Sequence, residues 1–296
     1  MDFGLVINTS KPEAIEFARE LYEWRKEQGK RFALISDQAQ SIGESGLPLS
    51  QWLKEVSTAV VIGGDGTFLR AAHLVRDTDI SLFGICLGHL GFLASGKPSR
   101  ARKDIEQIEK GNFSIEKRPL LEGILTTPEE KINVYALNDI VLRGGQARLI
   151  SADVQISGKP MCEYRADGVI ISTPTGSTGY ALAAGGPIVP PSILCMLLVP
   201  ICAHTLYARP TLVGPDDVVT VTPKGTTEMF ITVDGNEVYP LMKSDTLEIS
   251  LSREHFANVV ALPKYDYYDL LHEKLRWGWN PVSMLKDHPA RSVSDA

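Results

Sequence analysis

The segment Val60-Val61-Ile62-Gly63-Gly64-Asp65-Gly66-Thr67-Phe68-Leu69-Arg70 places an acidic residue in a glycine turn between an apolar strand and the start of a helix. Glycines allow positive φ and close approach of a ligand, and the free N–H groups at a helix start favour phosphate. Because Asp65 would itself repel phosphate, we interpret it as a proton acceptor or a Mg²⁺ contact beside a phosphate. The alternative is a tight βα turn in which Asp65 caps the helix at Thr67.

Around this segment, the first 110 residues alternate short apolar runs with helical patterns, which is typical of an α/β layer with a parallel sheet. Ser10 and Glu13 form the expected capping box of a first helix that Gly29 ends. A further helix is expected over 103–110, with Gly111 as its stop. The expected strands are Phe3 to Ile7, Phe32 to Ile35, Ala59 to Ile62 and Leu82 to Cys86.

Beyond Gly111 the pattern changes to many short β-prone runs separated by turn signals such as Ser157-Gly158, Lys224-Gly225 and Asp234-Gly235. We therefore expect an α/β domain over 1–115, a β-rich domain over 116–261, and a C-terminal helix and tail over 262–296. The helix, at 266–279, is expected to return to the first domain. It would bury Tyr267, Leu270, Leu271 and Trp277.

Composition sets limits on partners and location. The 296 residues carry a formal net charge of -6, which provides no global field for nucleic acid or an anionic membrane. The most apolar segment, 187–203, is shorter than a membrane span of about 20 residues and contains prolines, so we expect a buried core. The N-terminus lacks a secretory signal pattern, and the four cysteines form no CxxC pair. These features favour a cytoplasmic protein with buried thiols.

Three further segments carry polar residues at strand ends. In Arg165 to Tyr180, an apolar strand leads into glycine, serine and threonine, whose short hydroxyls and bare backbone suit a nucleotide, while Tyr180 offers a ring for stacking. A long polar β-loop is the alternative.

Asn138-Asp139 interrupts a β-prone run, where adjacent side chains face opposite sides. By itself, an Asx-type turn explains this pair as well. The loop 88–93 follows the fourth expected strand at its carboxyl end, where open α/β sheets bind ligands. Its His89 by itself establishes nothing.

The common nucleotide-binding motifs are missing. The sequence contains no GxxxxGK[ST], which excludes the P-loop mechanism, and no GxGxxG after a strand. Nucleotide binding must therefore use a different loop.

Taken in order, the motifs resemble those of bacterial NAD kinases over nearly the whole chain. The order is GGDGT at 63–67, GHLGFL at 88–93, LND at 137–139, DGVIISTPTGSTGY at 167–180, AGGPIV at 184–189 and VDGN at 233–236. GGDGT occurs also in diacylglycerol and sphingosine kinases. The segment 167–180, called the threonine-rich segment below, is much more specific to NAD kinases. Four positions depart from common family residues, namely Gly179, Ala183, Pro190 and Asn236, and none of them removes a reacting group.

The resemblance implies a Rossmann-like N-terminal domain, a β-sandwich-like C-terminal domain and a returning C-terminal helix. It implies an enzyme that phosphorylates the 2′-hydroxyl of the adenosine ribose of NAD, using ATP and a divalent metal such as Mg²⁺ to make NADP. The implied assembly is a homodimer or homotetramer, and Asp65 is the implied proton acceptor. No protein metal ligand is expected. The residues expected to bind substrate are Asp65, Gly66, Arg70, Phe92, Asn138, Asp139, Arg148, Arg165, Asp167, Thr175, Thr178, Gly179, Tyr180, Ala183 and Asn236.

Two other functions remain at this point. A lipid or sphingoid-base kinase usually has a small residue and Asn after GGDGT, whereas Phe68-Leu69-Arg70 follows here and no basic membrane-facing patch is evident. A non-catalytic dinucleotide sensor would keep the pocket. The presence of Asp65 argues against it.

Overall fold

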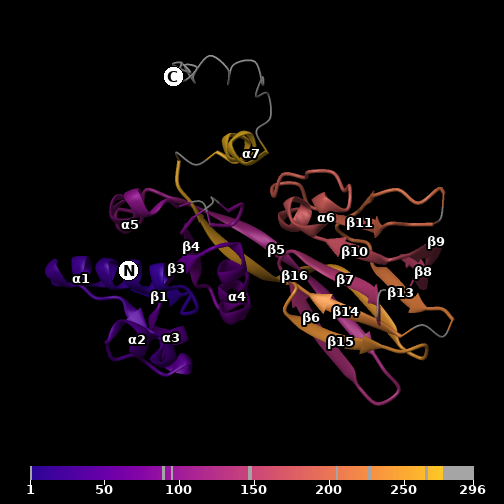
Figure 1. The fold of residues 1–296 in the computed structure, drawn as a ribbon, viewed down its shortest axis with the longest axis horizontal. Helices are drawn as coiled ribbons and strands as arrows, with labels where there is room; N and C mark the ends of the chain where they lie inside the picture. Colours follow the sequence, from indigo (N-terminus) through magenta and orange to yellow (C-terminus); the bar gives the residue numbers. More distant parts are fainter. Residues whose placement is uncertain are drawn as a thin grey trace, which may run out of the picture.

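The computed structural model describes residues 2–88, 91–94, 96–145, 149–204, 206–225, 228–263 and 266–275. Their strands form one sheet of ten strands and one of six. Helices and parallel strands occupy one side of the molecule and the β-rich part occupies the other (Figure 1). The expected combination of an α/β part and a β-sandwich part is confirmed.

The α/β part is a parallel sheet in the order β2-β1-β3-β4. Its central strands are buried on both faces, which is why they read as unbroken apolar runs. Val60 and Ile62 point into the core under α1 and α5, whereas Ala59 and Val61 point into the core under α3 and α4. The elements are β1 (Phe3–Ile7), α1 (Pro12–Glu27), β2 (Ala33–Leu34), α2 (Ser36–Ile42), α3 (Leu49–Glu55), β3 (Thr58–Gly63), α4 (Asp65–Val75), β4 (Ser81–Cys86), a 3₁₀ turn η1 (Pro98–Arg100) and α5 (Ala101–Glu109).

The start of α1 differs from the expected capping box. The helix begins at Pro12 with Lys11 as N-cap and no side-chain cap, and the Ser10 hydroxyl donates to Asn8 Oδ1 at 2.6 Å. Proline at the first position has φ already set for a helix and needs no N–H partner, so it provides the start. Gly29 follows the helix end with φ of +72°, as expected.

Two long strands connect the two parts of the molecule. β16 (Thr246–Ala261) pairs in parallel with β4 and antiparallel with β5 (Ser114–Thr126). The ten-stranded sheet therefore continues from the α/β part into the β-rich part, and the expected boundary at residue 115 falls inside β5. Its remaining strands are β6 (Lys131–Ala136), β8 (Ile150–Ile156), β9 (Lys159–Ala166) and β13 (Val219–Pro223).

The six-stranded sheet is antiparallel, in the order β12-β11-β10-β7-β14-β15. Ile140 and Leu142 on one face join the core shared with the other sheet, whereas Val141 on the opposite face packs under α6. The elements are β7 (Asp139–Gly144), β10 (Gly168–Ser172), a 3₁₀ turn η3 (Thr175–Thr178), α6 (Tyr180–Ala183), β11 (Met196–Ile201), β12 (Thr211–Val213), β14 (Met229–Val233) and β15 (Glu237–Leu241). The expectation of a buried core over 187–203 holds for Cys195 to Pro200, most of which form β11, whereas Ile193 and Leu194 are 50% and 55% exposed. No helix in the described part of the chain has the length and apolar character to cross a membrane.

The C-terminal helix α7 (Tyr267–Leu275) contacts the α/β part, as expected. Lys97 Nζ lies 3.1 Å from Glu273 Oε1, and Lys274 Nζ lies 5.3 Å from the centre of the Phe92 ring. Leu271 is buried and Tyr267 and Leu270 are partly buried, while Trp277 lies outside the described residues. The expectation that the cysteine thiols are buried is confirmed for Cys86 and Cys195, whereas Cys162 is partly buried and Cys202 is exposed.

Candidate active site

Asp65 is the first residue of α4, and its carboxylate is held by the loop that follows β4. Oδ2 accepts the Phe92 N–H at 2.9 Å, and Oδ1 accepts the N–H groups of Leu93 at 3.1 Å and Ala94 at 3.2 Å. The N-cap of α4 is Gly64, and Asp65 is not its side-chain cap. The alternative of a simple helix cap is therefore wrong. Oδ2 accepts one of these three hydrogen bonds, which leaves it the better-placed oxygen for a substrate hydroxyl.

The close fit between Asp65 and this loop depends on Gly91. A Cβ at this position would lie 1.9 Å from Asp65 Oδ1, which no real contact allows. Glycine therefore lets the loop backbone reach the carboxylate. His89, in the same loop, lies outside the described residues.

One face of α4 continues from Asp65 toward the β-rich part. Gly66, Arg70 and His73 follow each other at the i, i+4, i+7 spacing that places residues on one helix face. Gly66 and Arg70 are exposed, and His73 contacts Asp234 of the β-rich part through its Nε2, 2.8 Å from Oδ2. Asp234 also accepts the N–H groups of the residues where β7 begins, so its contact with His73 places α4 beside the start of β7.

Asn138 and Asp139 lie where β6 ends and β7 begins. The β-prone run is therefore interrupted at this pair, as the two adjacent polar residues indicated. Their backbone N–H groups donate to Asp234 Oδ1 at 2.8 and 3.0 Å, and the Leu137 N–H donates to Oδ2 at 2.8 Å. Among the described residues, the buried Asn138 Oδ1 has no hydrogen-bond partner. A buried acceptor without a donor is costly, so this atom is available to a ligand N–H or O–H group.

Asp139 is buried beside a second carboxylate. Burial and, to a smaller extent, the nearby Asp234 raise the pKa of Asp139 from 3.8 to about 7, and Arg143 opposes the rise. Near neutral pH the Asp139 carboxyl is therefore partly protonated, so it is able to donate as well as accept a hydrogen bond.

These residues line a cavity of about 400 Å³ on the outer face of the six-stranded sheet. Asp139, Val141 and Arg143 line it together because alternate residues of β7 share a face. Arg143 also lies over the Tyr180 ring, 4.8 Å from its centre, and its guanidinium donates to the Tyr180 hydroxyl. Sequence reasoning missed Arg143 and Asp234. The period-two pattern of β7 and the VDGN turn were the available signals.

Several hydroxyls of the threonine-rich segment bond backbone groups of the protein and so fix the conformation of this loop. Ser172 Oγ donates to Asn138 O, Thr173 Oγ1 donates to Leu137 O at 2.6 Å, and Ser177 Oγ bonds both Val189 O and Val189 N. All three serine and threonine side chains are fully buried. The expectation that hydroxyls here face a nucleotide is therefore wrong for these three: they fix the loop against the Leu137–Asn138 backbone.

The other expected site residues are dispersed. Thr175 is buried, Thr178 is partly buried with its hydroxyl donating to Thr175 O, and Gly179 and Ala183 are exposed near Tyr180. The Asn236 side chain donates to Asp234 O in the β14–β15 turn. Arg165 and Asp167 lie before β10 and are not among the residues that line the cavity. Arg148 lies outside the described residues.

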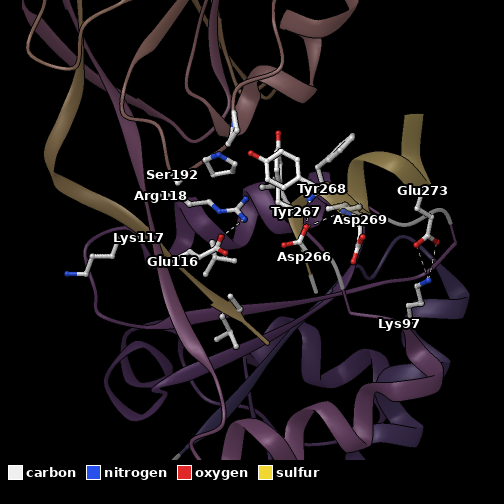
Figure 2. A pocket seen from close by; sticks show the side chains of 18 residues that line it. Lys97, Glu116, Lys117, Arg118, Ser192, Asp266, Tyr267, Tyr268, Asp269 and Glu273 are labelled. Atoms are coloured by element: carbon white, nitrogen blue, oxygen red, sulfur yellow. Dashed lines mark hydrogen bonds and ion pairs between the residues drawn. The ribbon is translucent and has the colours of Figure 1, made fainter. Parts of the chain in front are cut away.

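Phe92 and Leu93 border a different cavity, of about 550 Å³, whose lining residues are drawn in Figure 2. Tyr267 and Tyr268 of α7 form one wall, and Arg118 lies opposite them, bonded to Glu116. Both acidic and basic side chains line this cavity. Phe92 thus contacts Asp65 through its backbone and faces α7 with its ring.

A divalent cation fits this site only together with a phosphate. The described residues contain no group of three or more His, Cys, Asp or Glu side chains that could hold a metal ion. Mg²⁺ is commonly bound by one or two carboxylates, substrate phosphates and water. Asp65 supplies one carboxylate, so the donor set suits a cation that arrives bound to a nucleotide.

Two family models match the chain and define its class as a two-domain phosphotransferase. The ATP-NAD kinase N-terminal domain matches residues 49–113, and the ATP-NAD kinase C-terminal domain matches residues 137–261. The NAD kinase of Symbiobacterium thermophilum is 35% identical over 278 residues, covering 92% of this chain and 98% of that protein. The NAD kinase of Moorella thermoacetica is 35% identical over 295 residues, covering 98% and 94%. The chain belongs to the ATP-NAD kinase family and is a kinase that acts on NAD.

Solved structures agree on the fold. Yeast NADH kinase complexed with NADH has a TM-score of 0.88 at 24% identity, covering 95% of this chain and 89% of that one. The NAD kinase from Archaeoglobus fulgidus in complex with ATP has a TM-score of 0.73 at 24% identity, covering 93% and 99%. The family models and the curated relatives identify an NAD kinase rather than a lipid or sphingoid-base kinase.

Proposed function

We propose that this kinase transfers the γ-phosphoryl group of ATP to the 2′-hydroxyl of the adenosine ribose of NAD, with Asp65 as the proton acceptor. The observation that carries the proposal is the fixed Asp65 carboxylate, held by three backbone N–H groups at the start of α4. Such anchoring leaves the side chain one orientation. Positioning and charge neutralisation provide most of the catalysis in phosphoryl transfer.

The proton moves late in this mechanism. An aspartate, with an ordinary pKa of about 3.9, is too weak a base to remove a ribose proton beforehand. The hydroxyl oxygen attacks phosphorus, the bond to the leaving ADP oxygen breaks, and Asp65 Oδ2 receives the proton as the new P–O bond forms. Arg70 and the N–H groups at the start of α4 stabilise the transferred phosphoryl group. A divalent cation bound with ATP neutralises charge on the donor phosphates.

The cavity beside β7 is the proposed dinucleotide pocket. Asn138 Oδ1 needs a donor and the partly protonated Asp139 offers one, so ribose hydroxyls, which donate and accept, satisfy both, whereas an adenine amino group satisfies Asn138 Oδ1 alone. Tyr180 provides a ring for a base, with Arg143 on its face. Gly66, Thr175, Thr178, Gly179, Ala183 and Asn236 remain proposed contacts around it.

We further propose a cytoplasmic homo-oligomer in which Arg165 and Asp167 reach a neighbouring subunit's pocket. Both are exposed, and neither lines the cavity of its own protomer. Leu206 and Tyr207 are 80% and 90% exposed, and large apolar groups in such positions favour a protein contact. Light scattering on the purified protein tests this; a monomer at micromolar concentration would contradict it.

The Asp65→Asn variant tests the proton-acceptor role. The amide oxygen still accepts two of the N–H groups, and the Phe92 N–H loses its acceptor, which costs about 1–3 kcal/mol. We expect the fold and NAD binding to survive and kcat to fall at least about 100-fold. NADP formation from NAD, ATP and Mg²⁺ is followed with a coupled dehydrogenase, and NAD binding is followed by calorimetry. Turnover near the wild-type rate would refute the role.

A further inference from the structure

Asp234 is the most completely bonded carboxylate near the cavity. Its side chain is 0% exposed and accepts four hydrogen bonds: three from the N–H groups of Leu137, Asn138 and Asp139, and one from His73. The Asp234 N–H also donates to Asp139 O at 2.9 Å. Its φ of 47° is one that aspartate tolerates in a turn, with Gly235 following at 69°. The β14–β15 turn therefore fixes the start of β7 through backbone bonds.

His73 brings the fourth hydrogen bond from the other part of the molecule. It lies on α4, two turns after Asp65, which is about 12 Å along the helix axis. Because an ionised carboxylate only accepts hydrogen bonds, His73 Nε2 must carry the hydrogen and act as the donor of this hydrogen bond. His73 shares a helix face with Gly66 and Arg70, so this bond also fixes the rotation of α4 about its axis.

We propose that His73 and Asp234 are positioning residues that hold the helix bearing Asp65 in register with the pocket formed by Asn138 and Asp139. The proposal rests on the proposed function and deepens it. Neither residue needs to touch the reacting atoms. Asp234 sets the geometry of the pocket, and His73 sets the distance and orientation between pocket and proton acceptor. A loss of register of about 1 Å lowers turnover strongly while binding changes little.

The two roles separate in a His73 variant. His73→Leu keeps the side-chain volume and removes the donor, but the three backbone N–H groups still hold Asp234 and the pocket. We expect kcat to fall about tenfold or more and the Kd for NAD, measured without ATP, to change less than about threefold. His73→Gln places an amide N–H near the position of Nε2 and is expected to keep kcat within about threefold of the wild type.

His255 provides the matched control. It is also paired with an aspartate, Asp77, at 3.4 Å, its side chain is 22% exposed against 18% for His73, and it packs on Tyr135 at the same junction. It does not line the dinucleotide cavity. His255→Leu therefore loosens the junction without breaking the bond to Asp234, and we expect kcat to stay within about twofold.

The outcomes are decisive in either direction. Turnover of His73→Leu within twofold of the wild type, an equal loss in His73→Gln, or an equal loss in His255→Leu each overturns the proposal. Hydrogen exchange of the α4 amides gives a readout without turnover, and we expect it to speed up in His73→Leu and not in His73→Gln, whereas exchange of the 137–139 amides should stay unchanged in both. If the wild-type chain makes no NADP, the proposed function fails, and the exchange comparison alone decides the positioning role.

Discussion

Replacing Asp139 by Asn should change how stability depends on pH. In the unfolded chain this carboxyl loses its proton near pH 4, whereas in the folded protein it keeps the proton up to about pH 7 because of burial and the neighbouring Asp234. The folded state therefore binds more protons between these values, and the free energy of unfolding falls as pH rises through this window. A pKa that moves from 3.8 to about 7 corresponds to a penalty of roughly 4 kcal/mol once the group is ionised.

Asp139→Asn removes the ionisable group and with it this penalty. We expect the variant to gain stability relative to the wild type as pH rises from 4.5 to 8, by roughly 3 kcal/mol over this range. Urea unfolding followed by circular dichroism at several pH values measures the difference. Asp79→Asn, at an exposed position, is the control and should show a flat difference. A flat difference for Asp139→Asn would refute the reasoning.

Two further substitutions test the geometry around the site. Gly91→Ala places a Cβ 1.9 Å from Asp65 Oδ1, so the loop must move off the carboxylate; we expect kcat to fall at least about 100-fold with a lower Tm, and unchanged kinetics would contradict the role of this loop. Ser177→Ala leaves the buried N–H and C=O of Val189 without their hydroxyl partner; we expect a loss of about 2–4 kcal/mol in urea unfolding, and a loss below about 0.5 kcal/mol would be inconsistent with it.

The local pattern of the sequence determined the α/β part well. Buried parallel strands must be apolar on both faces, so β1, β3 and β4 appear as unbroken runs, and glycines mark the ends of helices because few other residues adopt positive φ. The short helices α2 and α3 were not predicted, since seven residues carry little periodic signal. The position of Asp65 at a strand-to-helix turn was likewise visible in the motif alone.

The bonds that give the site its chemistry were decided by the tertiary structure. Asp65 is held by amides 27 to 29 residues away, and Asp234 by amides 95 to 97 residues away. No local pattern encodes such pairs. The bonds to Asp65 form when β3 and β4 pair and bring the start of α4 beside the loop after β4. The bonds to Asp234 form when β16 extends the first sheet and the β14–β15 turn comes to lie beside α4. The raised pKa of Asp139 has the same origin: it depends on burial and on a second carboxylate, neither of which is a property of the residue itself. The sequence thus determined which groups could react, and packing determined where they are held and in which protonation state.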